Sequence, residues 1–190
     1  MNKYTSLIVV AAFVTSCSSS LAPLRKDGLK PTVVTETVLH DTDDPAIWIH
    51  PTNPQESLVI GTDKDTDGGL YVFNLQGKII KKSETIKRPN NVDIAYGLQI
   101  DGVLTDIAVT TERETNKIRI FSLPDLKPLD NGGIPVFEGE LERDPMGIAI
   151  YTRPSDKAVF AIVGRKSGPS GSYLWQYELK GTSNAKVEAT

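Results

Sequence analysis

The sequence predicts an all-β protein, a β-propeller of four-stranded antiparallel blades, and three observations support this. From Thr32 onward, short β-branched and aromatic runs alternate with Gly, Pro, Asn and Asp, as strands alternate with turns. No stretch keeps a helical period over a helix's length. The runs recur in groups of four, in the same order, over residues 43–83, 90–140 and 144–190. Four antiparallel strands repeated at about 40–50 residues indicate propeller blades, and a β-sandwich of similar hairpins is the alternative.

Each unit is expected to contain four successive strands. The first strands are DDPAIWI (43–49), NNVDIAY (90–96) and DPMGIAI (144–150), aligned on Ile47, Ile94 and Ile148. The second strands are SLVIGTDK (57–64), TDIAVTTER (105–113) and AVFAIVGRK (158–166). The third strands are GLYVFNL (69–75), NKIRIFSL (116–123) and SYLWQYEL (172–179). Weaker fourth strands follow at 77–83, 134–140 and 185–190, and TVVTETVL (32–39) is expected as a further strand before the first unit.

The composition is that of an ordinary globular protein. The chain has 190 residues, of which 39% are hydrophobic and 24% charged, and its formal net charge is −3. These values exclude a disordered chain, a collagen-like chain and a disulfide scaffold. Nucleic acid is not expected as a partner, because domains that bind duplexes usually carry a clear basic excess.

Residues 1–16 resemble a bacterial lipoprotein signal peptide. The apolar run from Leu7 to Val14 is too short to remain as a membrane span, and small residues then lead to Cys17, the only cysteine. We expect Cys17 to be lipidated, residues 17–31 to form a tether and residues 32–190 to form the folded domain. The protein would then be exported and anchored to the bacterial cell envelope, at the outer membrane or cell surface. An ordinary secretory signal with an incidental cysteine is the alternative.

Charged and amide residues recur where the first strands begin and where the second strands end. The first strands open with Asp43-Asp44, Asn90-Asn91 and Asp144. The second strands close with Asp63-Lys64, Glu112-Arg113 and Arg165-Lys166. Because the first and second strands of a blade are antiparallel, both sets are expected at the same end of the blades.

This mixture of residues suits a metal-assisted phosphate site. Carboxylate, amide and carbonyl oxygens are the ligands that Ca²⁺ prefers, and Lys and Arg bind phosphate oxygens. A metal ion beside such cations neutralises a phosphoryl group and activates water against it. The same residue types also favour strand ends and turns for structural reasons, which is the alternative for each of them.

Two further metal sites are considered. Residues 63–68 read D-x-D-x-D-G, the first half of a calcium loop, but the twelfth position is Asn74, so an acidic hairpin turn is equally consistent. His40 and His50 are separated by a predicted strand and lack a third partner in the sequence, which argues against zinc.

Several motifs resemble the β-propeller phytases, the alkaline calcium-dependent phytases of bacteria. They are DDPAIWIHPTNPQESLVIGTDK (43–64), GGLYVFNLQGK (68–78) and RPNNVDIAYG (88–97), and the likeness extends over about residues 33–190. The resemblance implies a propeller of six blades, of which about three are present here as an N-terminal part, and a monomer at full length. It also implies a 3-phytase that releases phosphate stepwise from phytate (myo-inositol hexakisphosphate), with calcium as cofactor.

The resemblance also assigns site residues. It places Asp43, Asp44, the Pro45 carbonyl, Asn91 and the Val92 carbonyl around calcium. Lys64, Arg113 and Lys166, or its neighbour Arg165, would hold substrate phosphates. Asp43, Lys64 and Arg113 are the residues expected to carry catalysis.

The chain also departs from the family pattern. Lys64 is followed by Asp65 where the family often has a second lysine, and Met146 stands where a tyrosine is expected. These departures motivate a second hypothesis, a non-catalytic envelope lipoprotein that binds a ligand or a protein partner. A related phosphoesterase with a different polyphosphorylated substrate is a third.

Overall fold

The computed structural model describes Arg25 and residues 27–190. The predicted signal peptide and Cys17 therefore lie outside the described residues. Contacts divide the chain into two units, residues 1–32 and 33–190, and the fold belongs to the second. Within the described part, no helix has the length and apolar character needed to cross a membrane.

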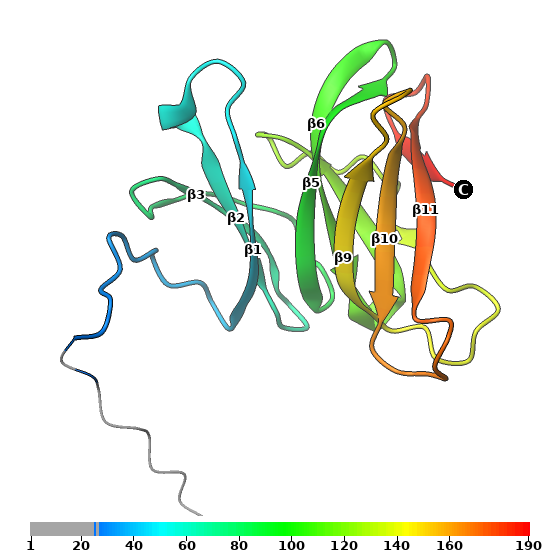
Figure 1. Cartoon of the computed structure of the whole chain (residues 1–190), viewed down its shortest axis with the longest axis horizontal. Helices are drawn as coiled ribbons and strands as arrows, with labels where there is room; N and C mark the ends of the chain where they lie inside the picture. Colours follow the sequence, from blue (N-terminus) through cyan, green and yellow to red (C-terminus); the bar gives the residue numbers. More distant parts are fainter. Residues whose placement is uncertain (1–24, 26) are drawn as a thin grey trace, which may run out of the picture. The chain divides into compact units, whose positions relative to one another are not determined.

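Residues 33–190 form three four-stranded antiparallel sheets, which confirms the all-β prediction and the propeller blades (Figure 1). The first sheet contains β1 (Thr42–Trp48), β2 (Leu58–Asp63), β3 (Gly69–Asn74) and β4 (Ile79–Lys82). The second contains β5 (Pro89–Ile100), β6 (Val103–Glu112), β7 (Lys117–Ser122) and β8 (Ile134–Pro135). The third contains β9 (Pro145–Thr152), β10 (Val159–Arg165), β11 (Leu174–Gly181) and β12 (Val187–Ala189). In each sheet the strands are paired in chain order, as successive hairpins require.

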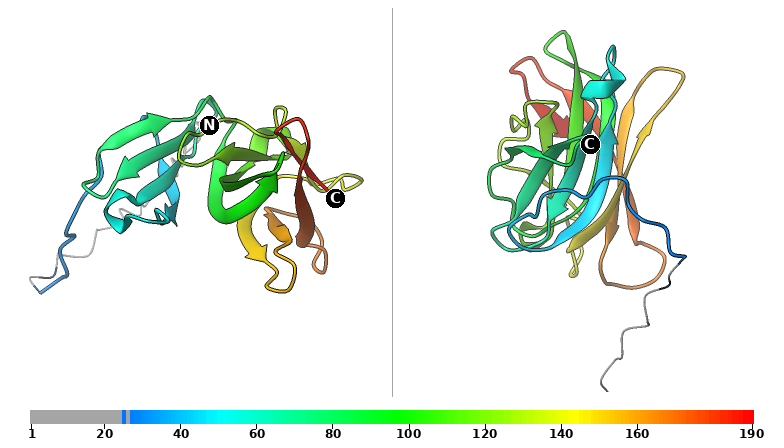
Figure 2. Two further views of the ribbon diagram at one scale, coloured as in Figure 1. Left: turned by 90° about the horizontal axis from the view of Figure 1, so that it is seen from above. Right: turned by 90° about the vertical axis from the view of Figure 1, so that its left-hand side faces the viewer.

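The sheets pack face to face, and their order can also be followed in the two views of Figure 2. Strands β1 and β5 are in contact, as are β5 and β9. One apolar core joins the first and second sheets, with Ile60, Val72, Ala108 and Phe121 at its centre. A second core joins the second and third sheets, around residues such as Val109 and Ala161. The second sheet is therefore covered on both faces, which explains why its strand β7 is buried from Ile118 to Phe121 although it contains Arg119.

Two expected strands are shorter or absent. Residues 33–39 form no strand, because a strand needs a ladder of backbone bonds to a neighbour. Instead, Glu36 donates its backbone N–H to the Gly77 carbonyl (2.8 Å), and its carboxylate accepts from the Lys78 amine and the Ile79 backbone N–H, both at 2.8 Å. The run at 134–140 pairs only over Ile134–Pro135, because the chain then turns inward and buries Phe137.

The alignment of the third unit on Ile148 is wrong by two residues. Each sheet has a β-bulge where its first strand begins, and the pairs that precede the bulge are Thr42 with Asp63, Pro89 with Glu112, and Pro145 with Arg165. Backbone bonds give the same alignment, because the N–H groups of Lys64, Arg113 and Lys166 donate to the carbonyls of Asp41, Arg88 and Asp144. Ile150, rather than Ile148, is therefore the equivalent of Ile47 and Ile94.

Candidate functional site

The predicted site residues lie at the end of the sheets where β1, β5 and β9 begin and β2, β6 and β10 end. We call this end the inner-strand rim; it comprises residues 41–45, 62–64, 88–92, 110–113, 144–147 and 164–166. The antiparallel pairing of each first strand with its neighbour brings these segments together within each sheet. Contacts of β1 with β5 and of β5 with β9 then place the three rim segments next to one another.

At the rim of the first sheet, Lys64 forms an ion pair with Asp43. The amine lies 2.7 Å from Asp43 Oδ1 and 3.5 Å from Asp41 Oδ2. The hydrogen bond to Asp43 raises the pKa of Lys64 above its usual value, so the amine is fully charged at neutral pH. The side chains of Lys64 and Asp43 are 24% and 31% exposed, so both can reach a ligand from solvent.

Asp44 connects the first sheet to the second. Its Oδ2 accepts from the Val92 backbone N–H at 2.9 Å, while its own N–H donates to Thr62 Oγ1 at 3.0 Å. In the described part of the chain, its Oδ1 has no hydrogen-bond donor, and the neighbouring Pro45 is exposed. Asp44 Oδ1, the Pro45 carbonyl and Asp43 therefore form a set of hard oxygen atoms that suits Ca²⁺.

The predicted ligands of the second sheet are more fully engaged. Asn91 Oδ1 accepts from the Asn90 amide at 2.7 Å, and the Asn91 carbonyl accepts from Thr110 Oγ1 at 2.8 Å. Val92 is paired with Thr110 in the β5–β6 ladder. An amide or carbonyl oxygen has a second lone pair, so both Asn91 oxygens can still bind a cation.

Two buried threonines at equivalent positions connect adjacent sheets, and sequence analysis missed them. Thr62 Oγ1 accepts from the Asp44 N–H and donates to the Asn90 carbonyl of the next sheet at 3.1 Å. Thr111 Oγ1 likewise accepts from the Asn91 N–H at 3.2 Å and donates to the Met146 carbonyl at 3.1 Å. The signal was present in the sequence, because each threonine directly precedes the acidic residue that ends its strand.

We predict that Thr62→Val and Thr111→Val each lower the free energy of unfolding by about 1–3 kcal/mol, because each leaves a buried backbone N–H and a carbonyl without a partner. Urea denaturation of purified protein measures this. Thr105→Val is the matched control, since Thr105 Oγ1 makes only a local contact of 3.5 Å to the Val103 carbonyl. Stability unchanged in both rim variants would contradict a bridging role.

Arg113 lies at the rim of the second sheet without a carboxylate at ion-pair distance among residues 27–190. Its guanidinium donates to Asn90 Oδ1, and its Nε is buried without a hydrogen-bond partner in that same range. Burial is the main cause that lowers the pKa of Arg113, and the nearby charge of Arg88 adds to it, while Asp144 and Asp43 act in the opposite direction. The side chain is thus a partly buried cation without an ion-paired carboxylate among residues 27–190, and Asp144 and Asp43 act on it only from a greater distance.

In the third sheet, Lys166 and Arg165 occupy different environments. Lys166 is exposed and is equivalent to Lys64 and Arg113, whereas Arg165 is equivalent to Asp63 and Glu112. The Arg165 side chain is 0% exposed, and its guanidinium donates to Glu140 at 2.7 Å and Ser172 at 2.6 Å. Of the two predicted cations, Lys166 is therefore the one that can reach a ligand in this structure.

The third sheet also lacks side-chain oxygens at two rim positions. With the corrected alignment, Met146 and Gly147 are equivalent to Asp43 and Asp44, and Asp144 is equivalent to Asp41. The described oxygen ligands of the rim therefore come mainly from the first and second sheets.

The acidic turn at 63–68 forms a hairpin between β2 and β3, and it brings a histidine and two carboxylates together. Asp63 is buried and accepts from the backbone N–H groups of His40 and Asp41 at 3.1 and 2.9 Å. His40, Asp65 and Asp67 each place one potential ligand atom within 4.8 Å of the others. The sequence argument that His40 lacks ligand partners is therefore wrong, because the hairpin supplies them. The contact of 2.7 Å between His40 Nε2 and Asp67 also accounts for this arrangement without a metal.

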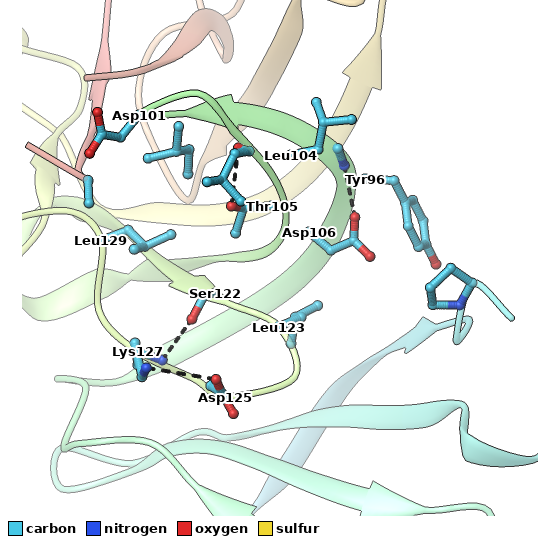
Figure 3. A pocket seen from close by; sticks show the side chains of 15 residues that line it. Tyr96, Asp101, Leu104, Thr105, Asp106, Ser122, Leu123, Asp125, Lys127 and Leu129 are labelled. Atoms are coloured by element: carbon cyan, nitrogen blue, oxygen red, sulfur yellow. Dashed lines mark hydrogen bonds and ion pairs between the residues drawn. The ribbon is translucent and has the colours of Figure 1, made fainter. Parts of the chain in front are cut away.

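One cavity of the second sheet lies away from the inner-strand rim. It has a volume of about 820 Å³ and lies at the opposite end of the second sheet, where β5 ends and β6 begins (Figure 3). Tyr96, Leu104, Leu123 and Leu129 form much of its wall. None of the predicted calcium or phosphate ligands lines it.

The sheets and the rim define a class of protein. The chain is an all-β protein of successive four-stranded propeller blades, with carboxylates and cations together where the first strands begin and the second strands end. The family model described as Phytase matches residues 4–189, and the chain belongs to this family. The 3-phytase of Bacillus subtilis (strain 168) is 32% identical over 137 residues, which is 69% of this chain and 35% of that protein. The chain thus spans about a third of the length of this relative.

Proposed function

We propose that the protein is a calcium-dependent phosphomonoesterase that releases phosphate from phytate. Membership of the phytase family and the likeness to a 3-phytase support this reaction. The observation that carries the proposal is the rim itself. Asp43 pairs there with Lys64, and Asp44 accepts a hydrogen bond from Val92 of the sheet that carries Arg113. Such a combination can hold a calcium ion and a phosphate side by side.

In this proposal, Asp43, Asp44, the Pro45 carbonyl, Asn91 and the Val92 carbonyl hold calcium. When bound, calcium would offset phosphate charge and lower the pKa of water that attacks phosphorus. Lys64, Arg113 and Lys166 bind phosphate oxygens and orient the ester. Lys64 must then exchange its contact with Asp43 for one with substrate, and the phosphate anion would replace Asp43 in stabilising the charged amine.

Hydrolysis of phytate by the protein at its full natural length is expected to stop when calcium is removed. Chelation followed by dialysis should reduce phosphate release to background, and added Ca²⁺ should restore it, because carboxylates without the metal repel the phosphate. Colorimetric phosphate detection measures this. Activity that survives exhaustive chelation would sink the proposal.

Finer proposals concern the phosphate that is removed first, the oligomeric state of the protein and its attachment to the membrane. By its likeness to a 3-phytase, the enzyme would act first at the 3-phosphate, which chromatography of the first inositol pentakisphosphate tests. We also propose that the protein works as a monomer. We also propose that Cys17 is lipidated and holds the protein at the cell envelope, which mass spectrometry of the mature N-terminus tests.

A second candidate is a propeller that binds its ligand without hydrolysis. The observation that favours it is the loss of oxygen ligands at Met146 and Gly147 together with Asp65 beside Lys64. In that case phytate, or a protein partner, would bind and no phosphate would appear. Hydrolysis of other polyphosphorylated esters in preference to phytate would instead indicate a related phosphoesterase.

A further inference from the structure

One position of the inner-strand rim changes charge from sheet to sheet. Asp41, Arg88 and Asp144 are equivalent, because the carbonyl of each accepts the backbone N–H of the rim cation of its own sheet. The distances are 2.8 Å to Lys64, 3.2 Å to Arg113 and 2.8 Å to Lys166. The first and third sheets therefore have a carboxylate at this position, whereas the second sheet has a guanidinium.

In the first sheet, the side chain at this position reaches the cation at the rim. In the first sheet, Asp41 Oδ2 lies 3.5 Å from the Lys64 amine, and Asp43 adds a second carboxylate at 2.7 Å. Lys64 is thus neutralised within its own sheet. In the second sheet, Arg88 occupies the equivalent position in the backbone bonding, and its charge lies close enough to Arg113 to help lower the pKa of Arg113. A second cation therefore stands where the first sheet has a compensating carboxylate.

No carboxylate of the described residues forms an ion pair with Arg113, and Asp144 and Asp43 act on its charge only from a greater distance. Within the described chain, the only carboxylate at ion-pair distance from Arg88 is Glu114, at 4.0 Å, and Glu114 Oε1 also accepts from Thr66 Oγ1 at 2.8 Å. The guanidinium of Arg113 donates to the neutral amide of Asn90 and has a buried Nε without a partner among residues 27–190. The Arg88 side chain is 42% exposed, so it is open to a ligand.

The backbone holds Arg88 in this place. Its N–H donates to the Asp65 carbonyl at 2.9 Å, and the N–H of Lys87 donates to Glu112 at 2.7 Å. Arg88 also adopts a left-handed backbone conformation with φ of 60°, which bulky residues rarely adopt. Hydrogen bonds on both sides therefore fix a backbone that arginine by itself disfavours.

We propose that Arg88 and Arg113 form a two-arginine anion site that binds a phosphate group of the substrate, with Arg88 as a further substrate-binding residue. This rests on the proposed function, since phosphate is the anion that phytate supplies. Two planar guanidinium groups offer paired donors that match phosphate oxygens, and a dianion offsets the repulsion between the two cations. The unpartnered Nε of Arg113 would also gain an acceptor.

The test compares three variants in isothermal titration calorimetry with inorganic phosphate in calcium-free buffer. Arg88→Asn removes the charge and suits the left-handed backbone, because asparagine adopts it more readily. We expect Arg88→Asn to weaken phosphate binding at least about tenfold and Arg88→Lys to weaken it less. Lys87→Gln is the control because it removes an exposed charge next to Arg88. It should change the affinity for phosphate less than about twofold. Equal melting temperatures by circular dichroism would show that the variants are folded.

Unchanged phosphate binding in Arg88→Asn would overturn the proposal, as would a wild-type protein that binds no phosphate at millimolar concentration. The KM for phytate separates this inference from the proposed function. Phytate hydrolysis with an unchanged KM in Arg88→Asn would reject the two-arginine site alone. Phosphate binding that depends on Arg88, without any phytate hydrolysis, would support the two-arginine site and reject the proposed phytase activity.

Discussion

Exchange of Lys64 for methionine is expected to lower kcat/KM for phytate at least about 100-fold in the calcium-loaded protein, and Asp43→Asn is expected to have a similar effect. Removing one preorganised charge from a site of this kind costs roughly 10²–10³ in rate. Lys64 would lose its contact with phosphate, and Asp43→Asn would weaken the calcium set and leave Lys64 near Asp41 alone. Steady-state phosphate release by the protein at its full natural length measures both effects.

The structure also supplies the controls for this experiment. The Lys64–Asp43 pair is partly exposed, so its loss should change the free energy of unfolding by less than about 1 kcal/mol, and unfolding would not explain the lost activity. Lys81→Met removes an exposed lysine from β4 and should leave kcat/KM unchanged. Because Lys64 and Asp43 act on the same substrate group, the loss of kcat/KM in the Lys64→Met, Asp43→Asn double variant should be smaller than the product of the two single losses. Full activity in Lys64→Met would remove Lys64 from the proposed mechanism.

Replacing Asp130 by alanine is expected to lower the free energy of unfolding by about 3–5 kcal/mol, the cost of breaking a buried ion pair. The Asp130 side chain is 0% exposed and accepts from Arg119 Nε at 2.8 Å, as well as from the backbone N–H groups of Ile120 at 2.8 Å and Gly132 at 3.1 Å. The Arg119 side chain is only 5% exposed. Without Asp130 it would keep an ion pair with Glu84 and a longer one, of 3.8 Å, with Glu112. Urea denaturation monitored by tryptophan fluorescence measures the loss.

Asp125→Ala is the matched control for this second prediction. Asp125 is 59% exposed and lies 3.9 Å from Lys127, so its removal should cost less than about 0.5 kcal/mol. Because Glu112 also binds the Lys87 N–H, Asp130→Ala should additionally loosen the segment that carries Arg88. Equal stability of the Asp130 and Asp125 variants would show that the buried network contributes nothing net.

Much of the site could be located from the sequence because the rim depends on strand order alone. Asp43, Lys64 and Arg113 fall at strand ends that any antiparallel blade brings together, and the structure places them there. The two-residue error in the third unit has a physical cause. A shift of two residues returns every side chain to the same face of a strand, so the alternation around Ile148 and Ile150 fits either alignment. The backbone bond from Lys166 to Asp144 decides between them.

Other features depend on contacts between segments that are distant in sequence. Nothing local distinguishes Arg165 from Lys166; Arg165 is buried because Glu140 and Ser172 receive its guanidinium. His40 meets Asp65 and Asp67 only because the β2–β3 hairpin folds back beside it. The sequence shows Thr62 and Thr111 at matching positions before an acidic residue, but their bonds to the Asn90 and Met146 carbonyls depend on how the neighbouring sheets pack.

The sequence by itself determined the all-β blades, their order and the family, because alternating apolar residues and turn residues act locally and recur in each unit. The tertiary structure alone decided which charges are compensated. Lys64 is paired with Asp43 and Asp41, whereas among the described residues Arg113 has no carboxylate at ion-pair distance and Arg88 has only Glu114, at 4.0 Å. The reason is geometric: electrostatic energy depends on distances of a few ångströms between side chains, and packing and backbone hydrogen bonds across the sheets set those distances.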